Sequence, residues 1–454
     1  MLNVFKHRYL PITEQDRKDM LEKIGVESVA ELFEDIPVSS QSESGQGSRI
    51  PEAMSELELT RHMQDLAGKN ATASTHAMFL GAGVYDHFIP SVVNHVLLRQ
   101  EFFTAYTPYQ PEASQGELQA LFEFQSMIAE LTGMPISNSS LYDGFAALGE
   151  AGNLAVGAVR KTNRILVSEG IHPQAIETLK TYGYAANYDV EPVGMAGDVT
   201  DLAELEEKID KDLSAVVIGY PNFLGSIEAI HKVKELLEGT KALLIVVANP
   251  LALATLEAPG KLGADIVVGD MQPLGLNMSF GGPHAGFMTV TKKLMRKMPG
   301  RMVGQTVDEN GDRGFVMTLQ TREQHIRREK ATSNYSSNQA LFALASGVFM
   351  SAMGKEGIVE MAQQNINKSH YFKQQLQEAG FEIFNERPFF NEFVVKVNQS
   401  VEAINDALFE EGFIGGYDVS DYVEGSEAVL LCATEKRTKE EIDTFVEKFA
   451  EVAK

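Results

Sequence analysis

The segment from Tyr106 to Pro111 holds two tyrosines, a glutamine and two prolines. Proline fixes the backbone angle φ, so the phenol groups of Tyr106 and Tyr109 and the amide of Gln110 can be held in fixed positions. Phenols and amides both donate and accept hydrogen bonds, which suits them to line the pocket of a small polar substrate. The residues are equally compatible with a loop that leads into a helix and packs its tyrosines, and both interpretations stay open.

Two histidines stand beside turns that would place them at the edge of a sheet. His172 follows a short apolar run that ends near Ser168, and a histidine just past the carboxyl end of a parallel strand lies where such sheets bind ligands. His284 closes a Gly-Gly-Pro-His turn before another apolar run, and its glycines would let the backbone approach a ligand or another chain. A hydrogen-bonded loop histidine and a plain turn are the alternative interpretations.

A third group of polar residues lies between Arg322 and Asn334. The part from Arg322 to Lys330 mixes both charges at helical spacing, which is typical of a solvated helix face. Thr332 and Ser333 follow directly, and hydroxyl groups of this kind are suited to bind phosphate oxygens. The end of this segment is therefore a candidate phosphate contact.

Other stretches that resemble catalytic motifs are incomplete. Gly81 to Asp86, which includes Tyr85, begins like a dinucleotide-binding fingerprint, but an aspartate stands at its sixth position and no clear strand precedes it, so a turn is favoured. The only cysteine, Cys432, lies inside an apolar run and is expected to pack in the core. The sequence contains no Walker A loop, HExxH motif, GxSxG elbow or cluster of metal ligands.

Composition narrows the class of protein. The 454 residues include 39 Lys and Arg against 63 Asp and Glu, a net charge of −24, and 44% of them are hydrophobic. A chain with this acidic balance repels phosphate backbones and anionic lipid headgroups, so general binding to nucleic acid or to membrane surfaces is not expected. A single cysteine cannot form an intrachain disulfide, and no apolar run follows the N-terminus, so we expect a cytoplasmic protein.

Short apolar runs alternate with helical patterns through the middle of the chain. This alternation predicts a mostly parallel sheet with helices on both faces. The expected strands are 164–168, 215–219, 243–248, 265–268 and 286–290. Two helices precede them, one from Glu117 that a capping box of Ser114 and Glu117 would open, and one after Asp143. The stretch 303–338 has little periodicity, and we expect a functional excursion with a helix there.

We divide the chain into three parts on these patterns. Residues 1–60 form an N-terminal arm, in which Thr13 and Asp16 suggest a capped helix. Residues 61–335 form a large α/β domain with interface loops. Residues 336–454 form a smaller α+β C-terminal domain. Its expected elements are a helix over 355–379, strands near Phe381 and Phe393, a helix over 401–411, a strand over 428–432 and a final helix from Lys439.

Three of these segments together resemble the P-protein of the glycine cleavage system. They are Tyr106 to Glu117, the Gly-Gly-Pro-His turn at 281–284, and the string Leu-Gln-Thr-Arg-Glu-Gln-His-Ile-Arg-Arg-Glu-Lys-Ala-Thr-Ser-Asn at 319–334. Residues 7–11 and 31–37 resemble the N-terminal arm of the same family. The resemblance covers nearly the whole chain. At 454 residues the chain is similar to the separate N-terminal-type subunit of that family, subunit 1 or alpha.

The resemblance implies a type I fold of the pyridoxal phosphate (PLP) enzymes, the aspartate aminotransferase-like fold. It also implies one subunit of glycine dehydrogenase (aminomethyl-transferring, decarboxylating), an oxidoreductase that decarboxylates glycine as its PLP adduct and passes the aminomethyl group to the lipoyl arm of the H-protein. PLP supplies the chemistry by acting as an electron sink. The implied partners are a homologous PLP-bearing subunit 2, in a heterotetramer with two copies of each chain, the lipoylated H-protein and glycine.

The chain departs from a PLP-bearing subunit at three places. Such a subunit needs a lysine to hold the cofactor as a Schiff base, and Gln272 and Pro273 stand about where a His-Lys pair is expected. Asn249 ends the strand at which an aspartate would keep the pyridine nitrogen protonated. Asp143 lies in the loop expected to cup the phosphate, which a carboxylate repels. We therefore expect no PLP bound covalently by this chain, and PLP on the partner subunit.

The resemblance implies a role in the partner's active site, because type I active sites lie at a dimer interface. No catalytic residue is expected on this chain alone, no metal, and no activity without the partner. The implied wall of the glycine or lipoyl pocket is Tyr106, Tyr109, Gln110, Tyr85 and His284, and the implied contacts to the partner's PLP phosphate are Thr332 and Ser333. Two alternatives are a catalytically silent scaffold or regulatory homologue, and a stand-alone PLP enzyme that uses another lysine.

Overall fold

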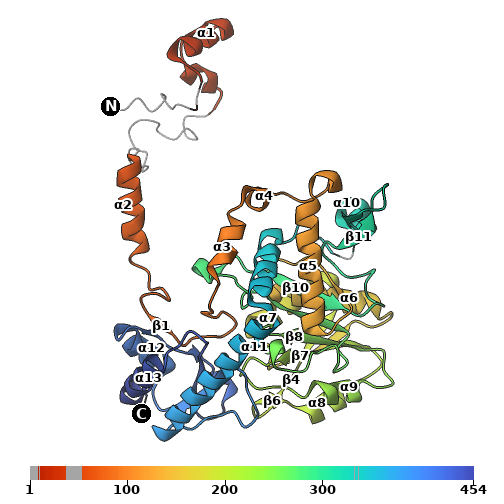
Figure 1. The fold of residues 1–454 in the computed structure, drawn as a ribbon, viewed down its shortest axis with the longest axis vertical. Coiled ribbons are helices and arrows are strands. Elements are labelled where there is room, and N and C mark those ends of the chain that lie inside the picture. Colours follow the sequence, from red (N-terminus) through yellow and green to blue (C-terminus); the bar gives the residue numbers. More distant parts are fainter. Residues whose placement is uncertain (1–8, 10, 37–53, 332, 336, 454) are drawn as a thin grey trace. The chain divides into compact units, whose positions relative to one another are not determined.

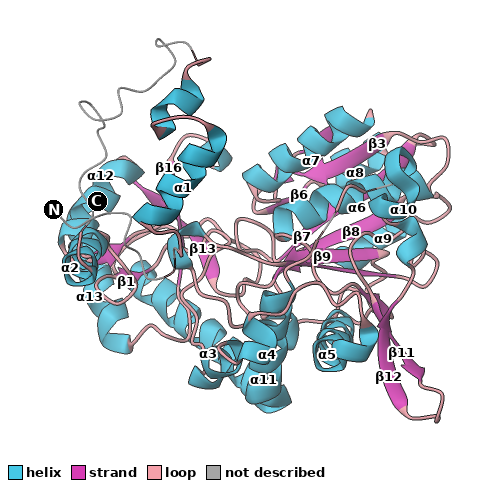
Figure 2. Cartoon of the chain, turned by 90° about the horizontal axis from the view of Figure 1, so that it is seen from above, coloured by secondary structure: helices cyan, strands magenta, loops and turns pink. Residues whose placement is uncertain are grey.

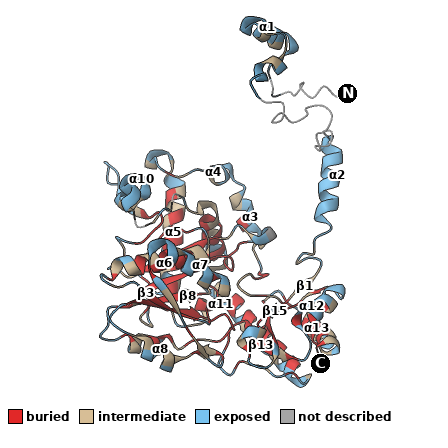
Figure 3. Cartoon of the chain, turned by 180° about the vertical axis from the view of Figure 1, so that it is seen from behind, coloured by how far each residue is buried: buried red, intermediate tan, exposed pale blue. Residues whose placement is uncertain are grey.

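The structure is a computed structural model that describes residues 9, 11–36, 54–331, 333–335 and 337–453 (Figure 1). Its contacts divide the chain into two units, Met1–Thr72 and Ala73–Lys454. In the first unit, Thr13 opens α1 (Glu14–Ile24) and Ser55 opens α2 (Glu56–Ala67), each through a capping box. The capping box predicted at Thr13 is therefore confirmed. Neither helix has a buried residue (Figure 3), and a capping box stabilises the N-terminus of each.

The second unit is built on a sheet of mixed direction in the order β2-β10-β9-β8-β7-β3-β4. Neighbours from β4 to β9 pair in parallel, whereas β10 is antiparallel to both β9 and β2. The prediction of a parallel-rich sheet is confirmed. Its strands are β2 (Ile136–Ser137), β3 (Arg164–Ser168), β4 (Asp189–Val193), β7 (Leu213–Tyr220), β8 (Leu243–Ala248), β9 (Ile266–Asp270) and β10 (Gly286–Val290).

Helices cover both faces of this sheet (Figure 2), which explains why its strands read as continuous apolar runs. In β7, Val216 and Ile218 point into a core shared with α5 and α11, whereas Ala215 and Val217 point into a core shared with α6 and α7. The helices of this unit are α3 (Ser91–Leu97), α4 (Gln100–Phe103), α5 (Gln115–Thr132), α6 (Gly144–Ala158), α7 (Pro173–Ala186), α8 (Leu202–Lys208), α9 (Ile230–Leu236), α10 (Gln324–Arg327), α11 (Ala340–Glu378), α12 (Val401–Glu410) and α13 (Lys439–Val452).

The C-terminal part forms a smaller sheet in the order β13-β16-β15. Its core is rich in phenylalanine, and the Phe79 ring packs against those of Phe372 and Phe445. Cys432 is 2% exposed in this region. The remaining strands of the unit are β1 (Ala77–Met78), β5 (Met195–Ala196), β6 (Val199–Thr200), β11 (Val303–Val307), β12 (Arg313–Met317), β13 (Glu392–Val397), β14 (Phe413–Ile414), β15 (Tyr417–Asp418) and β16 (Glu427–Cys432).

Three local expectations differ from the structure. Ser114 precedes α5 but makes no side-chain cap, because its backbone (φ −124°, ψ 22°) is not extended. The helix expected over 355–379 is confirmed as the part of α11 after Gly354, whose backbone (φ 62°) is not helical, but the part from Ala340 to Gly354 was not expected. The stretch 303–338 contains an antiparallel hairpin of β11 and β12 that the sequence pattern did not indicate. Among the residues described, no helix is long and apolar enough to cross a membrane.

Candidate functional site

A cavity of about 130 Å³ lies at the carboxyl ends of four strands, β3, β7, β8 and β9. This is the edge at which open α/β sheets bind ligands, because the loops after parallel strands diverge there. The four strands contribute Gly170, Pro221, Asn249 and Asp270 to its wall. The C-terminal part closes it with Glu392.

His172 lies on this wall, at the N-terminus of α7, as the strand before it predicts. Its ring contacts those of Phe145 and Phe223, each at 4.8 Å between centroids. Its Nδ1 accepts a hydrogen bond from the Gln174 N–H at 3.2 Å. Burial lowers the pKa of His172, so the imidazole is a neutral, flat surface of the cavity.

Gln272 occupies the place at which a cofactor lysine or its neighbour is expected, and it is 2% exposed. Its amide pairs with the backbone of Tyr85, accepting from the N–H at 2.9 Å and donating to the carbonyl at 2.8 Å. A second donor bond reaches the Leu276 carbonyl at 3.0 Å. The side chain is therefore committed to joining the segment around Tyr85 to the end of β9. Pro273, the next residue, lines the cavity.

Tyr85 is 7% exposed and lines this same cavity. Its hydroxyl donates to Glu392 Oε2 at 2.8 Å, and the Ala82 N–H donates to Glu392 Oε1 at 2.7 Å. Burial raises the pKa of Glu392 to about 7. The structure thus buries Tyr85 within this chain, where its hydroxyl is bound to Glu392.

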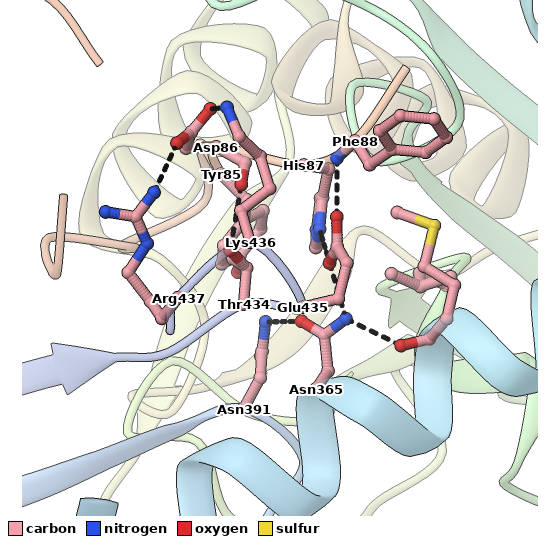
Figure 4. A network of polar contacts seen from close by, with 12 residues as sticks. Tyr85, Asp86, His87, Phe88, Asn365, Asn391, Thr434, Glu435, Lys436 and Arg437 are labelled. Atoms are coloured by element: carbon pink, nitrogen blue, oxygen red, sulfur yellow. Dashed lines mark hydrogen bonds and ion pairs between the residues drawn. The ribbon is translucent and has the colours of Figure 1, made fainter. Parts of the chain in front are cut away.

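The residues after Tyr85 are bound to the C-terminal part by a network of buried polar contacts (Figure 4). Asp86 pairs with Arg437 at 2.9 Å, and His87 Nδ1 lies 2.8 Å from Glu435 Oε2. Asn365 of α11 also donates to Glu435. The Gly81–Asp86 segment therefore has a structural role that joins the large sheet to the smaller one, in agreement with the turn that its sequence favours.

The cavity does not fit a covalently held anionic cofactor. Among the described residues that line it, none is a lysine or an arginine. The N-terminus of α6, where a phosphate would bind, is taken by two carboxylates: Asp143 accepts from the Ala146 N–H at 2.7 Å, and Asp270 accepts from the Gly144 N–H at 2.9 Å. Asn249 caps the turn that follows it through the Leu251 N–H. PLP, with its phosphate dianion, would meet fixed negative charge here and no amine.

A second region gathers candidate residues around the loop 139–144. Arg301 donates to the Tyr109 hydroxyl at 3.0 Å, and its other terminal nitrogen donates to Asn338 Oδ1 at 3.4 Å. Asn338 in turn donates to the Ser139 carbonyl and to the Ser140 hydroxyl, each at 3.2 Å. Tyr109 and the segment before α11 are therefore held against one loop by a single arginine and a single asparagine.

Ser333 reaches the same loop through Tyr335. Its hydroxyl accepts from the Tyr335 N–H at 3.1 Å, and the Tyr335 hydroxyl accepts from the Tyr142 N–H at 2.9 Å. The rings of Tyr335 and Tyr142 stack at 4.1 Å between centroids. Burial raises the pKa of the nearby Glu150 to about 7, an effect that the Ser333 side chain partly offsets. Thr332, the other predicted phosphate contact, lies outside the described residues.

His284 is connected to the loop 139–144 through Asp270, which also binds the Gly144 N–H. Its Nδ1 lies 3.1 Å from Asp270 Oδ1, and the hydrogen bond to this carboxylate raises the pKa of His284. Tyr106 is 85% exposed, and Gln110 is also exposed; neither side chain has a hydrogen bond to the part of the chain that the structure describes. Tyr109, Ser333 and His284 thus converge on the loop 139–144, and Tyr106 and Gln110 extend from it into solvent.

The residues that join this region were not found from the sequence. Arg301 and Asn338 stand in segments without a chemical motif, and each contacts a partner far away in the chain. Only the topology of the fold brings them together.

Comparison with known proteins gives a consistent result. The profile of the family "Glycine cleavage system P-protein" matches residues 7–449. A probable glycine dehydrogenase (decarboxylating) subunit 1 from Brevibacillus brevis is 58% identical over 440 residues, which cover 96% of this chain and 97% of the relative. The protein of the same description from Bacillus licheniformis is 56% identical over 447 residues, which cover 98% of this chain and 99% of the relative.

Solved structures agree with the fold. A crystal structure of glycine decarboxylase (P-protein) of the glycine cleavage system, in inhibitor-bound form, superimposes with a TM-score of 0.88 at 41% identity and covers 98% of this chain and 100% of that one. A NifS-like protein shares the fold with a TM-score of 0.62 at 16% identity, and covers 83% of this chain and 98% of that one. The fold is the type I fold of PLP-dependent enzymes.

Proposed function

The chain belongs to the P-protein family of the glycine cleavage system, as a chain of the subunit 1 type, and from this premise we propose that it completes the active site of a homologous PLP-bearing subunit without holding PLP itself. The pair of subunits decarboxylates glycine and transfers the remaining aminomethyl group to the lipoyl arm of the H-protein. PLP on the partner supplies the electron sink for this reaction. The complex is a heterotetramer with two copies of each subunit, and it works in the cytoplasm.

One observation carries this proposal: the residues around the cavity at the expected cofactor site disfavour the binding of PLP. Asp143 and Asp270 occupy the amides that would bind a phosphate. Gln272 and Pro273 stand about where a His-Lys pair is expected, and the Gln272 side chain is buried and hydrogen-bonded within this chain. A subunit of an enzyme that needs PLP, and whose own cavity disfavours it, must act on PLP held elsewhere.

The region around the loop 139–144 is the surface that we assign to the partner's active site. The Tyr109 hydroxyl is hydrogen-bonded to Arg301, and 55% of the residue's surface is exposed. Its ring can therefore contact a second chain. We assign Tyr106, Tyr109, Gln110 and His284 to the wall of the glycine or lipoyl pocket. Thr332 and Ser333 are assigned to the partner's PLP phosphate. Tyr85 is left out of this surface, because it is buried against Glu392.

Reconstitution tests the proposal. The purified chain, mixed with PLP and reduced with borohydride, should show no visible cofactor band and no pyridoxyl label, whereas the homologous PLP-bearing subunit should show both. The mixture of the two chains with lipoylated H-protein should release labelled CO2 from carboxyl-labelled glycine, and neither chain alone should do so. A single labelled lysine on the isolated chain, or full activity of the partner alone, would overturn the proposal.

The same preparation separates this function from that of a silent scaffold. Thr332→Ala should lower the turnover of the mixed complex without changing its elution in size-exclusion chromatography. A scaffold that contributes no side chain would give normal turnover with this variant and with every other variant of the assigned surface.

A further inference from the structure

The proposed function gives no role to the cavity at the carboxyl ends of β3, β7, β8 and β9. Its volume is about 130 Å³, which is close to the roughly 150 Å³ of an engineered protein cavity that binds one benzene molecule. Two residues of its wall, Phe145 and His172, are only half-buried, so a ligand can reach the cavity from solvent. The space is therefore suited to one small ring compound.

Aromatic rings form a rigid part of the cavity wall. The Phe223 ring contacts the edge of His172 at 4.8 Å between centroids, and Phe145 packs on the same imidazole at 4.8 Å. Phe223 is also in contact with the rings of Tyr417 and Tyr422, at 5.7 and 5.9 Å. Rings held by several neighbours lose little freedom when a ligand binds. Such a wall favours flat compounds, and the faces of its rings attract cations.

Glu392 brings a buried carboxylate to the polar side of the wall. It is 7% exposed, and each of its two oxygens accepts one hydrogen bond from a neutral donor, the Tyr85 hydroxyl or the Ala82 N–H. A carboxylate oxygen can accept two hydrogen bonds, so each keeps a further acceptor position. The described residues that line the cavity include no lysine or arginine, and the second carboxylate there, Asp270, already pairs with His284. Glu392 is thus the group of this wall that a cationic ligand would neutralise.

We propose that this cavity is a binding site for a small flat organic cation, a single aromatic ring that carries a protonated nitrogen group. The ring lies against the aromatic wall, and the cationic N–H group donates to Glu392. An anion of the same shape is rejected, because it would meet the carboxylates that also disfavour a phosphate. The site is formed by this chain alone and requires neither the partner nor PLP, so it is independent of the proposed function.

The two sides of the site come from different parts of the unit. Glu392 opens β13 in the smaller sheet, whereas Phe145 and His172 stand at the starts of α6 and α7, which cover the large sheet. A ligand that contacts both sides adds a connection between the two sheets. Because the site exists only in the folded chain, binding should raise the midpoint of thermal unfolding.

Three compounds of one shape test the charge preference on the isolated full chain: benzamidine is a cation, benzamide is neutral and benzoate is an anion. Titration calorimetry is run at about pH 8, above the pKa of about 7 that burial gives Glu392, so that this carboxylate is ionised. We expect benzamidine to bind at one site, about tenfold more tightly than benzamide, and to raise the midpoint of unfolding, whereas benzoate gives no heat of binding. No binding of benzamidine, or equally tight binding of benzoate, would overturn the proposal.

Glu392→Gln tests the carboxylate. The variant should bind benzamidine about tenfold more weakly than the wild type, with the affinity of benzamide, because the amide keeps the size of the side chain and loses its charge. The exposed Glu424→Gln is the matched control and should bind like the wild type. A preference for benzamidine that survives in Glu392→Gln would contradict the assigned position of the cation.

Phe145→Ala tests the aromatic wall, and it decides the question if Glu392→Gln does not fold. Loss of the ring should weaken the binding of both benzamidine and benzamide by about fivefold. Phe103→Ala, on a residue of α4 that is 57% exposed, should leave both affinities unchanged. Unchanged affinities in Phe145→Ala would place the ligand outside this cavity and overturn the proposal. Neither the partner nor PLP enters these titrations, so their result and that of the reconstitution are independent.

Discussion

The side-chain amide of Gln272 binds both backbone groups of Tyr85: it accepts a hydrogen bond from the N–H at 2.9 Å and donates one to the carbonyl at 2.8 Å. The amide thus makes the two hydrogen bonds that a neighbouring strand would make, and it connects the segment 81–88 to the end of β9. The Gln272 side chain is therefore a structural connection between two segments that are far apart in the sequence.

Gln272→Ala should destabilise the second unit. The substitution leaves the N–H and carbonyl of Tyr85 and the carbonyl of Leu276 unpaired in a buried place, which costs about 2–4 kcal/mol in total. Urea unfolding followed by circular dichroism measures this cost. Gln363→Ala, at an exposed position of α11, is the control and should change the free energy of unfolding by less than about 0.5 kcal/mol.

Pro273→Lys, at the position expected to hold the cofactor lysine, should not create a cofactor site. Asp143 and Asp270 still hold the N-terminal amides of α6, and the other walls of the cavity supply no cation. We expect no visible absorbance band when PLP is added to this variant, and a lower midpoint of unfolding because a lysine is then buried in the cavity wall. A stable band with a labelled lysine would show that the two carboxylates do not keep the cofactor out.

Glu392 should make the stability of the chain depend on pH. Its pKa is raised from 4.5 to about 7 in the fold. Its contribution to stability is therefore complete below about pH 4.5 and is lost as the pH rises through 7. Glu392→Gln should make the free energy of unfolding less steep between pH 5 and 7, by about 1.4 kcal/mol per pH unit. Glu424→Gln, at an exposed site, should keep the wild-type slope.

Tyr109→Phe should reduce the turnover of the mixed complex and leave its assembly intact. The change removes a hydrogen bond from the Arg301 guanidinium, worth about 1.5 kcal/mol, and so loosens the ring in the proposed pocket by a factor of roughly ten. Steady-state release of CO2 and size-exclusion chromatography measure the two properties. Tyr184→Phe, on a residue that is 92% exposed, should match the wild type in both.

Two further tyrosines should respond to loss of their hydroxyl in opposite ways. The Tyr188 hydroxyl is buried without a partner among the described residues. Tyr188→Phe should therefore be neutral or raise the free energy of unfolding by up to about 1 kcal/mol. The Tyr85 hydroxyl donates to Glu392, so Tyr85→Phe should lower it by about 1–3 kcal/mol. Thermal unfolding of both variants at pH 6 compares them; equal shifts would contradict the bonding pattern.

The sheet could be predicted from the sequence because its strands are buried on both faces. The runs 164–168, 243–248 and 286–290 coincide with β3, β8 and β10. The hairpin of β11 and β12 could not, because β11 exposes most of its residues and shows no apolar alternation. The apolar start of α11 gave no helical stripe, because Ala343, Leu344 and Ala345 are all buried together.

The sequence indicates candidate residues one by one, but not their arrangement. Tyr109 is positioned by Arg301, which lies far along the chain. Glu150 lies in an apolar helix, where nothing in the pattern sets one carboxyl apart from a solvated one. The sequence shows that residue 272 is a glutamine, but not what its amide binds. Its partner, Tyr85, lies 187 residues earlier in the chain. These pairings are set by topology rather than by local sequence.

The negative wall of the cavity has a practical consequence for anyone who purifies the assembled enzyme. Under the proposed function, visible colour in such a sample reports the partner alone. This chain contributes 13 tyrosines and no tryptophan to the ultraviolet spectrum. The ratio of the two bands, measured in one cuvette, would therefore reveal how many copies of each polypeptide are present without separating them.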